Sequence, residues 1–237
     1  VRKNGYRFKD FVVVARNAES YSGYVARQCE NNNIACFMDK KVKLSSTLLG
    51  IYLNILFELS KTFNTENVFK LLKTGLLSFT VEEISALEDY CYIWDIKGSD
   101  WKNDWEMSVN GLKTDEDNDY DNESLAKINE LRAKVFSIVS DFKNKFFGTP
   151  TDCSKAVFNH LVDNEIDKKL SALSNEFEIE DDNYNASLIK QSWDKVVSIL
   201  DSLCRVLDKT TISNADYIDA FIISADICEI SNIPQML

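Results

Sequence analysis

Glycine, proline and histidine are scarce in this sequence, and long apolar runs are missing. The 237 residues include 7 Gly, 2 Pro and a single His. Because Gly and Pro supply most tight turns, their scarcity disfavours a many-turned β architecture and favours long helices. No apolar run approaches the ~20 residues that cross a bilayer, and no charged-then-apolar leader opens the chain. We therefore expect a cytoplasmic protein with no membrane segment.

The sequence also lacks the common catalytic and metal-binding signatures. It contains no G-x-x-x-x-G-K-[ST], G-x-G-x-x-G, H-E-x-x-H or G-x-S-x-G motif. His160 has no Cys or second His at ligand spacing, so a surface or half-buried structural role is favoured over a metal ligand or general base. The six Cys are widely spaced, and most fall on apolar stripes, where free Cys acts as a small hydrophobe. We predict no catalytic residue, no metal site and no bound cofactor within this chain.

The net charge of −11 comes from two acidic segments, which we expect to be loops. Residues 114–123 hold six acids and residues 176–182 hold five, with no base in either. A strongly acidic surface repels nucleic acid. Because the charges balance elsewhere in the chain, this objection to nucleic acid binding applies only to the two loops. Asp115, Asp117, Asp119 and Asp121 alternate, which suggests calcium. However, the Gly and Glu positions of an EF-hand are absent, and solvated loops are favoured.

The hydrophobic period changes once along the chain. Phe11–Ala15 and Ile34–Met38 are apolar runs typical of strands covered on both faces, and the helix between them has Ser20 as its predicted cap. From Ser45 onward apolar residues recur with the period of helices. We predict a mainly α fold: a βαβ unit in residues 1–43, followed by a helical, bundle-like domain in residues 44–237.

Capping residues locate several of the predicted helices. Thr65 begins one helix, and the boxes Thr80–Glu83 and Ser213–Asp216 begin two others. Further helices are expected over residues 125–146, 152–173, 186–207 and 214–229. The stretch KGSDWKNDW has no period, and we expect an ordered loop pinned by its tryptophans. Trp94, Trp101 and Trp105 are residue types that stack on nucleic acid bases, but packing as anchors is favoured.

Arg16 is the one candidate binding residue. It directly follows the predicted strand FVVVA, and ligands bind at the carboxyl ends of strands in α/β folds. The guanidinium group suits phosphate oxygens. A surface ion pair with Glu19 or Asp39 is the alternative.

Two stretches carry a family resemblance. The first, VRKNGYRFKDFVVVARNAESYSGYVARQCENNNIACFMDKKVKLSS, resembles the start of the second motor domain of UvrD- and RecB-like superfamily 1 helicases. The second, NVFKLLKTGLLSFTVEEISALEDYCYIWDIKGSDW, resembles the B subunits of AddAB (RexAB)-type ATP-dependent helicase/deoxyribonucleases. The resemblance covers essentially all 237 residues and is most specific over the first hundred.

The resemblance implies a fold and a function. It implies that residues 1–43 are the βαβ edge of a RecA-like motor domain and that residues 44–237 are a 2B-like helical insertion. The parent enzyme would process double-strand DNA ends for recombinational repair with a partner A subunit, ATP, Mg and an iron–sulfur cluster. Those cofactors would be held outside this chain. Arg16 would occupy the position that reaches the nucleotide's terminal phosphate, although the motor of such B subunits resembles a degenerate one.

The preferred hypothesis is thus a non-catalytic fragment that contacts DNA, both single-strand and duplex ends, and the A subunit. Val1 at the start and the apolar run Ile233–Leu237 at the end are typical of an excised piece, or of omitted disordered residues. The alternative is a free-standing helical scaffold or regulatory protein without a DNA role. An independent enzyme would need an unrecognised acid pair such as Glu82 and Asp89.

Overall fold

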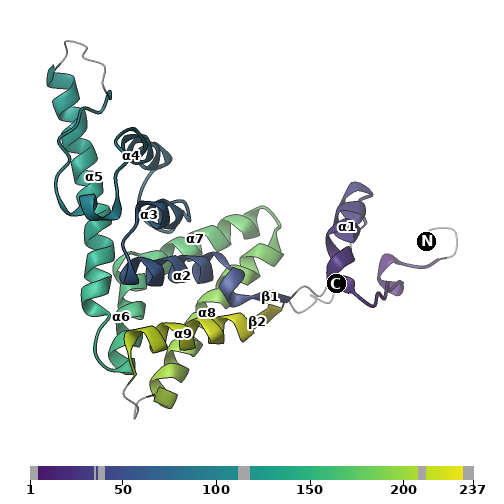
Figure 1. The fold of residues 1–237 in the computed structure, drawn as a ribbon. Helices are drawn as coiled ribbons and strands as arrows, with labels where there is room; N and C mark the ends of the chain where they lie inside the picture. Colours follow the sequence, from purple (N-terminus) through teal and green to yellow (C-terminus); the bar gives the residue numbers. More distant parts are fainter. Residues whose placement is uncertain (1–4, 35, 37–40, 112–117, 208–211, 232–237) are drawn as a thin grey trace.

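A computed structural model gives the fold of the chain and describes residues 5–34, 36, 41–111, 118–207 and 212–231. Most of these residues are helical, and the prediction of a mainly α fold with only a small β part is confirmed (Figure 1). The helices are α1 (Ala18–Asn31), α2 (Leu48–Lys61), α3 (Thr65–Leu72), α4 (Val81–Ile93), α5 (Asn118–Lys145), α6 (Pro150–Asp163), α7 (Ile166–Ile179), α8 (Asn183–Leu207) and α9 (Asn214–Ile227). Short 3₁₀ turns are η2 (Phe8–Asp10), η3 (Leu44–Ser46) and η4 (Gly98–Lys102).

Helix α2 lies at the centre of a helical body formed by α2–α9. Its side chains are apolar on nearly all sides, and it contacts α3, α5, α8 and α9. The Phe57 ring of α2 packs against Phe142 and Phe146 of α5 and against Phe221 of α9, with ring centroids 5.2–6.2 Å apart. This aromatic cluster joins segments that are far apart in the sequence into one core.

Local capping signals fix where several helices begin. The Thr80 and Ser213 hydroxyls each accept a hydrogen bond from the backbone N–H three residues later, at 3.2 and 3.1 Å. The Glu83 and Asp216 carboxylates accept from the backbone N–H of those same two caps. Both predicted capping boxes are therefore confirmed, and they satisfy N–H groups that lack helical partners.

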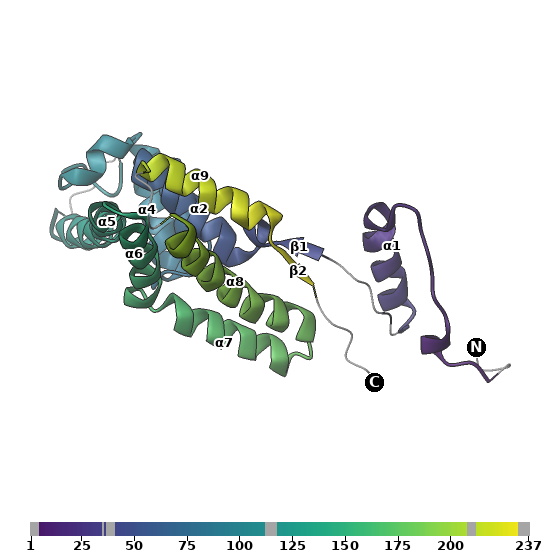
Figure 2. The same cartoon turned by 90° about the horizontal axis from the view of Figure 1, so that it is seen from below.

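The two ends of the helical body meet in a small antiparallel ribbon. Strand β1 (Lys41–Lys43) pairs with β2 (Glu229–Ser231), so that Lys41 lies opposite Ser231 and Val42 opposite Ile230. The Leu44 N–H also donates to the Cys228 carbonyl at 2.9 Å. The body therefore begins and ends at one place (Figure 2).

Residues 5–34 lie beside this body in both views (Figures 1 and 2). The run Phe11–Ala15, predicted as a strand, has no strand assignment in the structure, and Val12, Val13 and Val14 are each more than 80% exposed. No element in the described part of the chain pairs with this run or covers it. Most of the second predicted strand, Ile34–Met38, lies outside the described residues. The intervening helix α1 is confirmed, but its N-cap is Asn17 and not Ser20.

Three predicted segments also differ from the structure. The expected helix over residues 152–173 is two helices, because Glu165 adopts a left-handed backbone with φ of 56° between α6 and α7. The acidic segment 176–182 is mostly helical: α7 continues to Ile179, and the Asp182 side chain then accepts from the Asn185 N–H near the start of α8. In the other acidic segment, residues 118–123 already belong to α5, and residues 114–117 lie outside the described part.

The division of the chain at residues 43 and 44 stays a prediction. Within the described residues, no helix is both long enough and apolar enough to cross a membrane.

Candidate functional site

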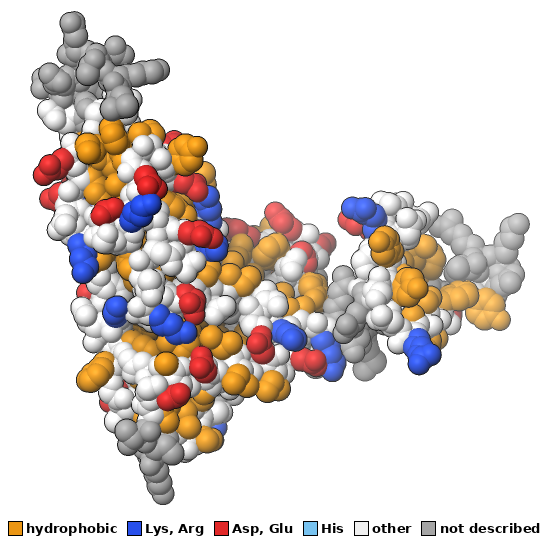
Figure 3. All heavy atoms as spheres, in the orientation of Figure 1, with side chains coloured by type: hydrophobic (Ala, Val, Ile, Leu, Met, Phe, Trp, Pro, Cys, Tyr) orange, Lys and Arg blue, Asp and Glu red, His pale blue; other side chains and the backbone are white. Residues whose placement is uncertain are grey.

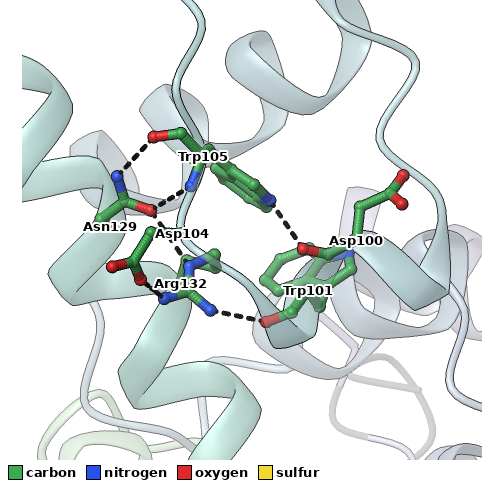
Figure 4. A network of polar contacts seen from close by, with 6 residues as sticks. All are labelled: Asp100, Trp101, Asp104, Trp105, Asn129 and Arg132. Atoms are coloured by element: carbon green, nitrogen blue, oxygen red, sulfur yellow. Dashed lines mark hydrogen bonds and ion pairs between the residues drawn. The ribbon is translucent and has the colours of Figure 1, made fainter.

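The most extensive polar network we find joins the KGSDWKNDW segment to α5 (Figure 4). Trp101 is fully buried and Trp105 nearly so, as expected for an ordered loop pinned by its tryptophans. The indole Nε1 of Trp101 donates to Thr65 Oγ1 at 3.0 Å, and that of Trp105 donates to the Asp100 carbonyl at 3.1 Å. Their buried rings exclude Trp101 and Trp105 as stacking platforms for bases.

Trp94 behaves in the same way near the end of α4. It is half-buried, and its Nε1 donates to the Ser108 carbonyl at 2.9 Å. All three tryptophans therefore act as anchors, which is the interpretation that the sequence favours.

Arg132 lies at the centre of this network and was not anticipated from the sequence. Its guanidinium is buried, donates to the Trp101 carbonyl at 2.6 Å, and pairs with the exposed Asp104 carboxylate. Asn129, one turn earlier on α5, accepts from the Trp105 N–H at 2.8 Å and donates to the Trp105 carbonyl at 2.9 Å. The only signal for this role in the sequence is that Arg132 is a charged residue beside the apolar stripe of a predicted helix. Its partners Trp101 and Asp104 lie far away in the sequence.

His160 forms a second buried polar centre, with Tyr52. The Tyr52 hydroxyl lies 2.7 Å from His160 Nε2, and the two rings stack. Burial lowers the pKa of His160 to about 4, although the Asp163 carboxylate acts in the opposite direction. Burial also raises the pKa of the Tyr52 hydroxyl well above its ordinary value. The expectation of a surface or half-buried side chain is wrong, but the structural role is supported because neutral His160 completes a hydrogen bond inside the core.

No disulfide bond joins the six cysteines, whose side chains range from buried (Cys91, Cys153) to exposed (Cys36). Burial raises the pKa of Cys91 to about 12 and that of Cys153 to about 11. Such thiols remain protonated at neutral pH and are poor nucleophiles.

No family model matches this sequence. Among curated proteins, it is 28% identical over 242 residues to the B subunit of the ATP-dependent helicase/deoxyribonuclease of Caldanaerobacter subterraneus subsp. tengcongensis. It is 29% identical over 241 residues to the B subunit of Thermoanaerobacter sp. strain X514. It is 32% identical over 238 residues to that of Clostridium botulinum strain Hall. These alignments cover 98–100% of this chain.

The chain is similar, over 98–100% of its length, to one segment of these B subunits. It spans about one fifth of the length of these relatives, 21% in each case. The predicted resemblance is therefore confirmed over the whole chain, including the part beyond the first hundred residues.

In the structure, Arg16 lies in a turn between the exposed run Phe11–Ala15 and α1. Its side chain is exposed and forms no ion pair with any residue that the structure describes. The alternative partners Glu19 and Asp39 have side chains outside the described part. The nucleotide-phosphate role of Arg16 thus stays a prediction.

Within its described part, the chain shows no group of three or more His, Cys, Asp or Glu that would hold a metal ion. The alternating carboxylates at Asp115, Asp117, Asp119 and Asp121 have side chains outside the described residues. The side chains around Arg132 and around His160 form hydrogen bonds and ion pairs with one another. These contacts fit a structural role for both centres.

Proposed function

We propose that this chain acts as part of the B subunit of an ATP-dependent helicase/deoxyribonuclease, which processes double-strand DNA ends for recombinational repair. The observation that carries this proposal is the homology to these B subunits over the whole chain. The name of the relatives implies a multi-subunit enzyme, so we also propose a partner, the A subunit, and single-strand and duplex-end DNA as ligands.

Within that enzyme, we propose that the helical body is a non-catalytic insertion that handles DNA and contacts the partner. The pairing of β1 with β2 supports this arrangement, because adjacent ends allow a domain to be inserted into a host without disturbing it. The buried polar centres at Arg132 and His160 also fit a structural and not a catalytic role.

The exposed run Val12–Val14 supports packing of this segment against other parts of the enzyme. Three consecutive valines in water are typical of a sheet strand that lacks its neighbours, and burying them would contribute favourable free energy. We therefore propose that residues 1–43 form the edge of a RecA-like motor domain. A free-standing scaffold, the alternative, would leave this run exposed.

We further propose that ATP, Mg and the iron–sulfur cluster are held by other parts of the enzyme. Arg16 is the one residue of this chain that we place near the nucleotide, where its guanidinium would contact a phosphate oxygen. A cytoplasmic location follows from the proposed DNA substrate.

An excision experiment tests the proposed function. In the full-length B subunit that carries this chain, residues 44–228 are replaced by a short Gly-Ser turn that joins β1 to β2. Assembled with its A subunit, this variant should lose at least ~10-fold in ATP-dependent degradation of linear duplex DNA, which is about 1.4 kcal/mol of activation free energy. Closed circular DNA, which has no ends, is the control substrate. Full activity of the excised enzyme would show that the helical body has no part in DNA processing.

A further inference from the structure

Lys134 on α5 is held in place by two uncharged groups. Its Nζ donates to the Ser78 carbonyl at 2.6 Å and lies 4.2 Å from the centroid of the Phe79 ring. Both partners belong to the connection between α3 and α4. A carbonyl oxygen and an aromatic face attract the ammonium group but do not neutralise it. Lys134 therefore presents an oriented side chain that keeps its full positive charge, and this side chain is exposed.

A second lysine lies close to Lys134. Lys169 on α7 is half-buried, and its pKa is lowered first by burial and then by the neighbouring Lys134 cation. The Glu165 carboxylate acts on Lys169 in the opposite direction but less strongly, and it pairs with Lys168. Helices α5 and α7 thus bring two cations together although like charges repel each other.

Neither of these lysines has a carboxylate partner. No ion pair joins Lys134 or Lys169 to any residue that the structure describes. The sequence has 38 acids and 27 bases, so a shortage of acids does not explain this. On the face shown in Figure 3, basic and acidic side chains are scattered among one another. Binding of an anion to that face would depend on particular residues and not on a broad positive patch.

We propose that Lys134 and Lys169 bind phosphate groups of the DNA backbone. The choice of DNA as the ligand rests on the proposed function. Lysine is a common phosphate ligand, and a phosphate group beside two neighbouring ammonium groups would offset their mutual repulsion. Contacts of this kind position DNA without reading its sequence, so we expect the same affinity for DNA of any sequence.

The salt dependence of DNA binding tests this inference. The full-length B subunit is assembled with its A subunit, and the dissociation constant for a forked DNA is measured without ATP or Mg, so that the DNA is not degraded. Between about 50 and 200 mM salt, Lys134→Gln/Lys169→Gln should lower the slope of log affinity against log salt by about 1–2, because each lost phosphate contact lowers it by about one. At the lowest salt, we expect at least ~5-fold weaker binding.

A matched double variant removes the same charge elsewhere on the helical body. Lys155 on α6 and Lys195 on α8 are exposed. Lys155→Gln/Lys195→Gln should change the affinity less than about 2-fold and leave the slope unchanged. Equal losses in the two double variants would overturn the inference, because the effect would then be one of overall charge.

A single charge reversal keeps the test decisive if the Lys134 substitution disturbs the α3–α4 connection. Lys169→Glu leaves Lys134, Ser78 and Phe79 unchanged and should weaken DNA binding at least ~10-fold. Thermal unfolding within about 2 °C of the wild type shows that a variant is folded. Unchanged affinity and slope in a folded variant overturn the inference. Failure of the wild-type complex to bind forked DNA would instead refute the proposed DNA-handling function itself.

Discussion

The guanidinium of Arg132 on α5 donates to the backbone carbonyl of Trp101, which lies 31 positions earlier in the chain, at 2.6 Å. Through this bond one buried cation holds a carbonyl of the short 3₁₀ turn η4 against α5. The same side chain contacts Asn129 and Asp104, so its loss would leave several polar groups without partners.

Replacing this arginine tests its structural role. We expect Arg132→Ala to lower the free energy of unfolding by about 2–4 kcal/mol, because the Trp101 carbonyl loses its partner and a cavity forms beside the tryptophans. Urea unfolding followed by tryptophan fluorescence gives the value. Arg205→Ala on the exposed side of α8 is the control, with an expected change within about 0.5 kcal/mol. Equal effects of the two substitutions would contradict the assignment.

The single histidine makes stability sensitive to acid. His160 has a folded-state pKa of about 4, below its ordinary value of about 6.5, so the unfolded state binds the proton more tightly. Stability from this group is complete above pH 6.5 and falls by about 3 kcal/mol as the pH drops towards 4. Proton NMR should show one imidazole titration, because the chain has only one His. A midpoint near 6.5 in the folded protein would refute the burial of His160.

A second stability measurement compares the wild type with His160→Gln between pH 7 and pH 4.5. Gln keeps a hydrogen-bonding group near Tyr52 but does not titrate. The variant should therefore lose less stability than the wild type over this range, whatever the carboxylates contribute to both proteins.

Gly50 on α2 lies too close to a backbone carbonyl to accept a side chain. A Cβ at this position would lie 2.0 Å from the Leu44 carbonyl oxygen. We expect Gly50→Ala to destabilise the body by more than about 2 kcal/mol, since η3 would have to move. Gly23→Ala on α1, where a Cβ meets no atom within 4 Å, should be neutral or stabilise its helix by about 0.5–1 kcal/mol. Circular dichroism during thermal unfolding distinguishes the two, and a tolerated Gly50→Ala would show that the close approach is absent.

Glu165 adopts a left-handed backbone that suits glycine better than glutamate. With φ at 56°, Glu165→Gly should raise the free energy of unfolding by about 0.5–1 kcal/mol, because the Cβ penalty is removed. The exposed ion pair with Lys168 is lost as well, but such pairs contribute little. Glu180→Gly, at a position with φ of −82°, should show no gain. Destabilisation by Glu165→Gly would mean that this turn is not left-handed in solution.

Arg16 offers a test of the proposed nucleotide contact. Arg16→Ala should leave the unfolding free energy within about 0.5 kcal/mol of the wild type, because the side chain is exposed. In the assembled enzyme, the apparent affinity for ATP should fall several-fold. A loss of stability above about 2 kcal/mol would instead identify Arg16 as a structural residue.

Features set by neighbouring residues could be predicted from the sequence. The capping boxes at Thr80 and Ser213 need only residues within one turn, and the structure contains both. The helix break at Glu165 was missed because no Gly or Pro marks it. The environment of Arg132 was missed because its partners come from a distant loop.

The run Phe11–Ala15 shows a different limit. Its apolar sequence is that of a buried strand, but burial requires neighbouring strands that the described part of this chain does not supply. The sequence therefore predicts a run suited to burial between neighbouring strands, whereas the structure shows the run exposed. Helix α4 shows the opposite: Val81 and Tyr92 are apolar but 79% and 88% exposed, which the apolar period alone does not predict.

The ribbon of β1 and β2 has a consequence for how this fold can be varied. Opposed residues in such a pair lie about 5 Å apart, a gap that a tight two-residue turn also closes. A protein carrying the helical body could thus exchange it for a hairpin, or for an unrelated domain of any size, with no change to the geometry of the attachment point. Homologous chains can therefore differ greatly in length at this position and still share a framework.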